Sequence, residues 1–292
     1  MQTSANPSNA QILIDEKIRQ LKAQRNLLSP VSKIPPEVLG QIFTRVTEYT
    51  MASHLKPTIR FNFSFVSQHW RNVAISTPQI WTVLSEDYLT WSRVMLERSK
   101  TADLVVHVDI QRGYGRSEYS ISRKSEFLQH VFEKHASRIV HLSVESNRDI
   151  PNFPPLTPRL QILYLSFEGS RTDPLHFPTY LLSASPLVEL RVEGYKVDWK
   201  LFSFPALKTL ILMFVRSEPS SALDFIKALQ RTPQLERLRI FHSLPVSFDR
   251  AELSTIPPVE LLALQELHIS DTSSASLIPC LKIPASVSVA LS

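Results

Sequence analysis

Leu235-Glu236-Arg237-Leu238-Arg239-Ile240 is the clearest copy of a six-residue motif that recurs along this chain of 292 residues. Apolar residues occupy its first, fourth and sixth positions, and the positions between them vary. Six copies begin at residues 139, 160, 187, 207, 235 and 264, so neighbouring copies start 20 to 29 residues apart. A period of this length is typical of proteins assembled from stacked units.

Each copy of the motif predicts a short β-strand. Residues two apart on a strand point to the same face, so the fourth and sixth positions share one apolar face and the fifth position points the other way. A single strand cannot cover its own apolar face, whereas a stack of such strands buries a shared core. We therefore expect the six copies to lie side by side, with their apolar positions inside and their variable positions outside.

The repeated region resembles the leucine-rich-repeat family, which has this pattern and spacing. Prolines stand one or two residues before four copies, where they end the preceding segment. Apolar residues at helical spacing predict a helix over Ser220–Arg231. The family's asparagine after the strand is missing and the repeat lengths are uneven, so the resemblance implies an irregular solenoid.

Further elements are expected on both sides of the six copies. Leu104–Val108 is predicted to form an edge strand, and Ser125–Ala136 is predicted to form a helix that leads into the repeated region. Ile278–Leu291 reads as a partial unit after the last copy. Helix Glu86–Ser99 is expected to join this region to the segment before it.

The segment from residue 34 to residue 81 predicts three short helices. Pro35 and Pro36 before Glu37 favour a helix start, and the apolar residues that follow fall on one face. A second helix carries Phe65 and Trp70 at the same spacing, and Thr77-Pro78 would start a third. The earlier run Asn9–Leu28 is also helical in pattern and is expected to pack against these helices.

This segment resembles an F-box. The family's opening motif corresponds to Ile34-Pro35-Pro36-Glu37-Val38-Leu39, with isoleucine in place of leucine. Its second signature corresponds to Val66-Ser67 and Trp70-Arg71, with serine in place of the common cysteine, and residues 47–60 look like an insertion. The resemblance implies a non-catalytic receptor that docks a Skp-type adaptor of a cullin-RING ubiquitin ligase and holds a target protein on its repeats.

The resemblance also assigns two sets of site residues. The adaptor would contact an apolar surface formed by Ile34, Pro35, Glu37, Val38, Leu39, Ile42, Phe43, Phe65, Val66 and Trp70. The target would contact variable positions of the motif copies, namely Glu189, Arg191, Lys208, Glu236, Arg237, Arg239, Glu266 and His268. Mixed charge at these positions suits a protein partner better than a lipid.

Other readings of the same residues stay open. The helices could pack only against other parts of the chain and cap the repeats of an interaction scaffold. The apolar face of residues 34–43 would then be buried within the chain. The variable positions could be an ordinary solvated surface. Nucleic-acid binding, suggested by the net charge of +5, would require clustered basic residues, but acidic residues are interspersed among them.

Catalysis, cofactors and metals receive no support from the sequence. Five glycines cannot build a glycine-rich phosphate loop, and the nine histidines show no zinc-protease spacing. The single Cys280 permits no internal disulfide, and we see neither a secretion signal nor an apolar run of about 20 residues. We expect a protein that is not an enzyme and that resides in the cytoplasm, the nucleus or both.

The predicted fold class is an α+β or α/β repeat protein in which an F-box-like helical bundle precedes an irregular leucine-rich-repeat solenoid. Four segments are expected. They are an N-terminal helix with a partly disordered start (1–30), the F-box-like domain (31–85), a connecting helix, edge strand and helix (86–136), and the solenoid (137–292).

Overall fold

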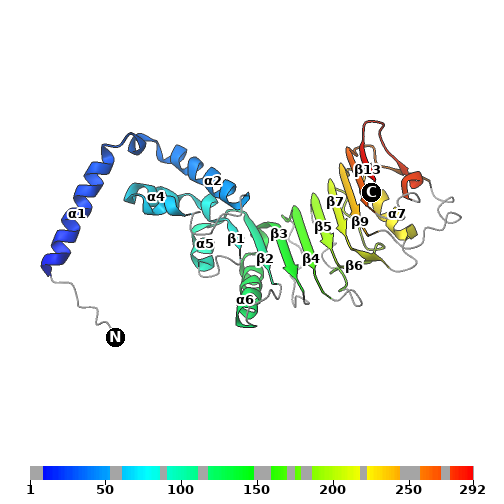
Figure 1. Ribbon diagram of the computed structural model, residues 1–292, viewed down its shortest axis with the longest axis horizontal. Coiled ribbons are helices and arrows are strands. Elements are labelled where there is room, and N and C mark those ends of the chain that lie inside the picture. Colours follow the sequence, from blue (N-terminus) through cyan, green and yellow to red (C-terminus); the bar gives the residue numbers. More distant parts are fainter. Residues whose placement is uncertain are drawn as a thin grey trace. The chain divides into compact units, whose positions relative to one another are not determined.

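The computed structural model describes residues 9–52, 61–85, 91–110, 118–147, 159–169, 175–178, 186–217, 222–243, 257–270 and 277–291. The chain forms two compact units. Unit 1 consists of Met1–Thr82 with Trp91–Ala102, and unit 2 of Val83–Thr90 with Asp103–Ser292. Unit 1 is mostly helical, whereas unit 2 is built on a β-sheet (Figure 1).

The sheet of unit 2 has nine parallel strands, which lie side by side in Figure 1. Their spatial order is β1-β2-β3-β4-β5-β7-β9-β11-β13, so each strand pairs with the one that precedes it in this sheet. The strands are Val83–Ser85 (β1), Leu104–Asp109 (β2), Ile139–Ser146 (β3), Ile162–Phe167 (β4), Glu189–Glu193 (β5), Thr209–Met213 (β7), Arg237–Phe241 (β9), Glu266–Ser270 (β11) and Ser288–Leu291 (β13).

The register of the strands aligns the apolar positions of the motif. Leu190 lies opposite Leu210, which lies opposite Leu238, and all three side chains are 0% exposed. Burying a leucine side chain contributes about 1.5–3 kcal/mol, so this row is a main source of stability. The prediction of a strand at each of the six copies is confirmed, in β3, β4, β5, β7, β9 and β11.

The connections between strands supply the rest of the core of unit 2. Trp199 and Phe202 are 1% exposed and pack against each other, and Trp199 also packs edge-on against Phe225 with ring centroids 4.8 Å apart. Arg231 holds one connection in place by donating hydrogen bonds to the carbonyl oxygens of Trp199 and Lys200. The connections contain α6 (Glu118–His135), η5 (Ala136–Arg138), α7 (Ala222–Gln230), η7 (Ile278–Cys280) and the short pairs β6–β8 (Lys196–Val197, Arg216–Ser217) and β10–β12 (Val259–Glu260, Leu281–Lys282).

Unit 1 packs around a cluster of aromatic rings. Phe43 stacks on Phe63 with ring centroids 4.3 Å apart, and Phe61 stacks on the fully buried Trp81 at 4.9 Å. The indole nitrogen of Trp81 donates to the carbonyl oxygen of Ala74 at 2.8 Å. The elements are α1 (Asn9–Leu27), η1 (Pro30–Lys33), α2 (Pro36–Ala52), η2 (Asn62–Phe65), α4 (Gln68–Ser76), η3 (Pro78–Trp81) and α5 (Ser92–Arg98).

The predicted fold class, an F-box-like helical bundle followed by a leucine-rich-repeat solenoid, is wrong. The main body is one large parallel sheet with helices, an arrangement of α/β type, and the sheet already begins with β1 and β2, before the first motif copy. Only α6 and α7 are α-helices among the described residues of unit 2. Strand pairing also extends beyond the six copies, to β1 and β2 on one side and to β13 on the other, and β1 has no counterpart among the predicted strands, so one sheet forms the main body.

The predicted bundle also differs in its parts. The segment after Thr77 is a four-residue 3₁₀ helix rather than an α-helix. No residue of α1 is buried, so the expectation that it packs against the following helices is wrong. The four predicted segment boundaries stay predictions. No helix in the described ranges is both long and apolar enough to cross a membrane.

Candidate protein-interaction surfaces

Helix α2 divides the apolar residues of the first predicted site between two faces. Leu39 and Phe43 are 1% and 2% exposed and point into the core of unit 1. Val38, Ile42 and Val46, spaced four residues apart and therefore on one stripe, remain 45%, 43% and 39% exposed. These three residues are called the α2 outer face below. Together with Gln41 and Arg45 they line a shallow hollow of about 480 Å³.

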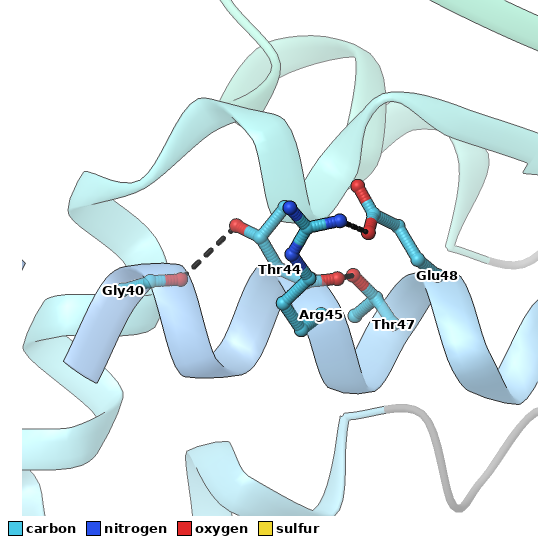
Figure 2. A network of polar contacts seen from close by, with 5 residues as sticks. All are labelled: Gly40, Thr44, Arg45, Thr47 and Glu48. Carbon is cyan, nitrogen blue, oxygen red and sulfur yellow. Dashed lines mark hydrogen bonds and ion pairs between the residues drawn. The ribbon is translucent and has the colours of Figure 1, made fainter. Parts of the chain in front are cut away.

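A second hollow lies beside α2, between this helix and the segment Ser76–Gln79. Its volume is about 560 Å³, and it is lined by polar and apolar groups. Gly40 allows the close approach here, because a Cβ at this position would lie 2.9 Å from Oγ1 of Thr77. Figure 2 shows the polar contacts on this helix: Thr44 donates to the carbonyl oxygen of Gly40 at 3.0 Å, and Arg45 pairs with Glu48 at 3.0 Å.

The remaining residues of the first predicted site differ in exposure. Pro35 and Glu37 are exposed and Ile34 is half-buried. Phe65 and Val66 are 65% and 58% exposed, at the end of η2. Trp70 is half-buried and packs against Phe43 at 5.1 Å. Leu39 and Phe43 thus serve the core of unit 1, while the other apolar members remain partly or largely exposed.

The second predicted site lies on the face of the sheet opposite the core. Along β5 and β11 buried residues alternate with partly exposed ones. The residues of this face align across the strands in rows: Glu189 lies opposite the buried Thr209, Thr209 opposite Arg237, and Arg237 opposite Glu266. The next row places Arg191, Ile211, Arg239 and His268 side by side. This surface is called the open sheet face.

All eight predicted target-binding residues are on or next to the open sheet face. Glu189, Arg191, Arg237, Arg239, Glu266 and His268 belong to strands β5, β9 and β11, whereas Lys208 and Glu236 each precede a strand by one residue. The structure therefore brings together residues that are up to 79 positions apart in the sequence, from Glu189 to His268.

Ion pairs join neighbouring strands across the open sheet face. Lys208 Nζ lies 2.7 Å from Glu236, and Arg239 Nε lies 2.7 Å from Glu266. The hydrogen bond from Arg239 holds the pKa of the Glu266 carboxyl below its usual value. Both pairs are solvent-exposed to a large extent, so each adds less than about 1 kcal/mol. Arg237 differs, because its Nε donates to a neutral oxygen, Thr209 Oγ1, at 3.0 Å.

An aromatic group that the sequence reading missed lies on the β2–β4 side of this face. The ring of His141 packs edge-on against both His107 and Tyr164, at 4.8 and 5.1 Å. Burial, and then the charge of His107, lower the pKa of His141 to about 4. Burial, and then the hydrogen bond to Glu189, raise the pKa of Tyr164 to about 12. Neither group changes its charge near neutral pH, so they do not form an acid–base pair there.

A hollow of about 280 Å³ adjoins these rings at the carboxyl ends of β3, β4 and β5. Glu145, Glu168 and Glu193 line it together with Arg191, which pairs with Glu193 at 3.4 Å. Among the described residues, no group of three His, Cys, Asp or Glu side chains has the geometry to hold a metal ion. Burial raises the pKa of the Cys280 thiol, which makes it a poor nucleophile at neutral pH.

Comparisons with protein-family models, curated proteins and solved structures found no match.

Proposed function

We propose that this chain is a non-catalytic substrate-recognition subunit of a cullin-RING ubiquitin ligase, with an F-box-like segment at residues 34–81. In this proposal the α2 outer face docks a Skp-type adaptor, and the open sheet face binds a target protein. The assignment to this class rests on the resemblance of Ile34–Leu39 and Val66–Arg71 to the two F-box signatures.

The exposure of the α2 outer face is the observation that carries the proposal. Leu39 and Phe43 already supply the core contacts of this helix, so the fold of unit 1 does not account for Val38, Ile42 and Val46 on the other stripe. Three neighbouring aliphatic side chains over a hollow are typical of a protein contact site. If the helices packed only within the chain, this stripe would be covered by other residues of the chain. Its exposure therefore favours docking.

The experiment measures binding of a purified Skp-type adaptor to the full chain by isothermal titration calorimetry. The test variant Val38→Ala/Ile42→Ala removes exposed aliphatic atoms and should leave the fold intact, because neither side chain is buried. Loss of two well-packed contacts should weaken binding by about tenfold or more. The matched control Leu13→Ala/Ile14→Ala removes two side chains of α1 that are 71% and 59% exposed, and it should bind as the wild type does.

Two results would overturn the adaptor proposal. One is the absence of adaptor binding by the wild-type chain. The other is equal affinity of wild type and Val38→Ala/Ile42→Ala, because this would place the contact elsewhere. Circular dichroism of each variant shows whether its helices are retained.

A further inference from the structure

Three strands of the sheet end in the same kind of turn. Gly194, Phe214 and His242 each follow the last residue of a strand, β5, β7 and β9 respectively. Each backbone N–H donates at 2.9 Å to the carbonyl oxygen of the last residue of the next strand, namely Met213, Phe241 and Ser270. The three residues have positive φ angles of 74°, 51° and 47°. They therefore occupy equivalent positions at the carboxyl ends of three neighbouring strands.

This backbone conformation favours glycine. Gly194 meets the expectation, and a Cβ there would also lie 2.0 Å from the carbonyl oxygen of Phe167. Phenylalanine is a rare residue in the left-handed region, and a bulky side chain there raises the conformational energy of the folded chain. Since glycine makes the same turn one strand earlier, the turn itself does not require the rings of Phe214 and His242.

Burial does not account for these two rings either. Phe214 is 48% exposed and His242 is exposed. The rings stack on each other with centroids 5.5 Å apart and planes inclined by 19°. The chain thus holds an exposed aromatic pair at strained positions, an arrangement that points to contact with another molecule.

Cationic and apolar side chains of the open sheet face precede this pair in the sequence. Met213 and Phe241, the residues just before the pair, face outward in one row and are half-buried. Arg237 and Arg239 share that face of β9 with Phe241. Arg239 is paired with Glu266, and the charge of Arg237 also lowers the pKa of this carboxyl, but the side-chain hydrogen bond of Arg237 is to the neutral Thr209. An acidic group of a partner would complement Arg237.

The distance along β9 sets the spacing of such a partner. Arg237 and Phe241 are four residues apart, which on an extended strand corresponds to about 13 Å. An extended segment along β9 would therefore place an acidic side chain at Arg237 and, about four residues away, an aromatic or large aliphatic side chain at Phe241, the residue before His242 of the ring pair. A nucleic acid fits less well, because Glu193, Glu236 and Glu266 around the same strands would repel its phosphates.

We infer that Phe214 and His242, with Arg237, anchor a target protein through an extended segment in which an acidic residue and an aromatic or large aliphatic residue are about four positions apart. This inference rests on the target-binding part of the proposed function. It assigns the anchoring to a strand-end pair that lies outside the predicted target-binding set.

The experiment selects short random peptides on the immobilised full chain and, in parallel, on the variant Phe214→Gly/His242→Gly. Glycine suits both turns, as Gly194 shows, so the variant should keep the fold and lose only the rings. Peptides enriched by the wild type should contain the acidic and apolar residues at the stated spacing. Their affinity, measured by fluorescence anisotropy, should fall about tenfold or more in this variant and in Arg237→Gln. The control Leu262→Ala, which alters a 63% exposed side chain elsewhere in unit 2, should bind normally.

The inference is overturned if the wild type enriches no peptide, or if the enriched peptides bind the glycine variant equally well. It is also overturned if an oligouridine RNA, tested on the same proteins, binds in a ring-dependent way while no peptide does. Adaptor binding is measured alongside on every variant and should not change. If the wild type does not bind the adaptor, only the ligase role is contradicted. If it selects no peptide, only this anchoring site is contradicted.

Discussion

The surroundings of His141 favour the neutral form of its imidazole ring. Its ring is packed between His107 and Tyr164, and its Nε2 is buried without a hydrogen-bond partner among the described residues. A charged imidazolium in this place would lose hydration and would be repelled by His107, so the neutral form is favoured. The residue therefore acts as an aromatic spacer between strands β2 and β4 rather than as a base.

A pH dependence of stability follows from this. The pKa of His141 falls from 6.5 in the unfolded chain to about 4 in the folded one, so the unfolded state binds more protons between these values. The contribution of His141 to stability is therefore fully present above pH 6.5 and is lost as the pH falls towards 4. Allowing for the solvent-exposed part of the ring, we expect about 1 kcal/mol of destabilisation between about pH 7 and pH 5 from this residue.

Urea denaturation at the two pH values checks this expectation. The variant His141→Leu removes both the titrating group and the unpaired nitrogen, so its stability should change less with pH than that of the wild type. The control Leu262→Ala, at an exposed position that carries no titrating group, should retain the wild-type slope. An unchanged slope in His141→Leu would show that the ring titrates normally.

Individual elements differ in how far the sequence determines them. The motif strands were predictable because two apolar positions two residues apart recur at every copy. Strands β6, β8, β10 and β12 are two residues long and carry no period that could reveal them. The helix expected after Thr77 became a 3₁₀ turn, which its proline start does not distinguish from an α-helix.

The candidate surfaces were predictable in part for the same kind of reason. Val38 and Leu39 are neighbours in an apolar cluster that spans more than one stripe of α2, and only packing decides that Leu39 is inside and Val38 outside. The open sheet face follows from strand alternation. The turns at Phe214 and His242 could not be foreseen, because glycine and asparagine are the usual sequence signals of a left-handed residue.

The start of α4 offers a test at the level of one element. Ser67 is the N-cap of this helix, and its hydroxyl accepts a hydrogen bond from the backbone N–H of Trp70 at 3.2 Å. Replacement Ser67→Ala should lower the free energy of unfolding by about 1 kcal/mol, because it leaves a helix N–H without its partner.

The same helix supplies the control. Ser76 is exposed at the other end of α4, where Ser76→Ala should change the free energy of unfolding by less than about 0.5 kcal/mol. Chemical denaturation followed by tryptophan fluorescence compares the two variants, since Trp70 and Trp81 lie in unit 1. Equal effects of the two substitutions would contradict the capping role.

At the scale of the whole molecule, both proposed surfaces consist of residues that the two cores do not use. In unit 1 one stripe of α2 packs inward and the other remains open, and in unit 2 strands such as β5 and β11 bury one face and carry polar side chains on the other. A partner can therefore be exchanged by changing outward residues without altering the fold. Because the proposed binding variants leave the core unchanged, a loss of binding in them can be attributed to the surface rather than to unfolding.

The continuous parallel sheet makes the cost of a core substitution depend on its place in the strand order. Leu210 on β7 has a strand on each side and is 0% exposed, whereas Val289 on β13 belongs to the same apolar row but is 47% exposed. We expect Leu210→Ala to lower the free energy of unfolding by about 3 kcal/mol, because it leaves a cavity that tight packing on both sides cannot close. Val289→Ala should cost less than about 1 kcal/mol, since solvent already reaches its side chain. Urea denaturation of both variants measures the difference, and similar losses would mean that β13 is covered in solution by a contact that the described residues do not provide.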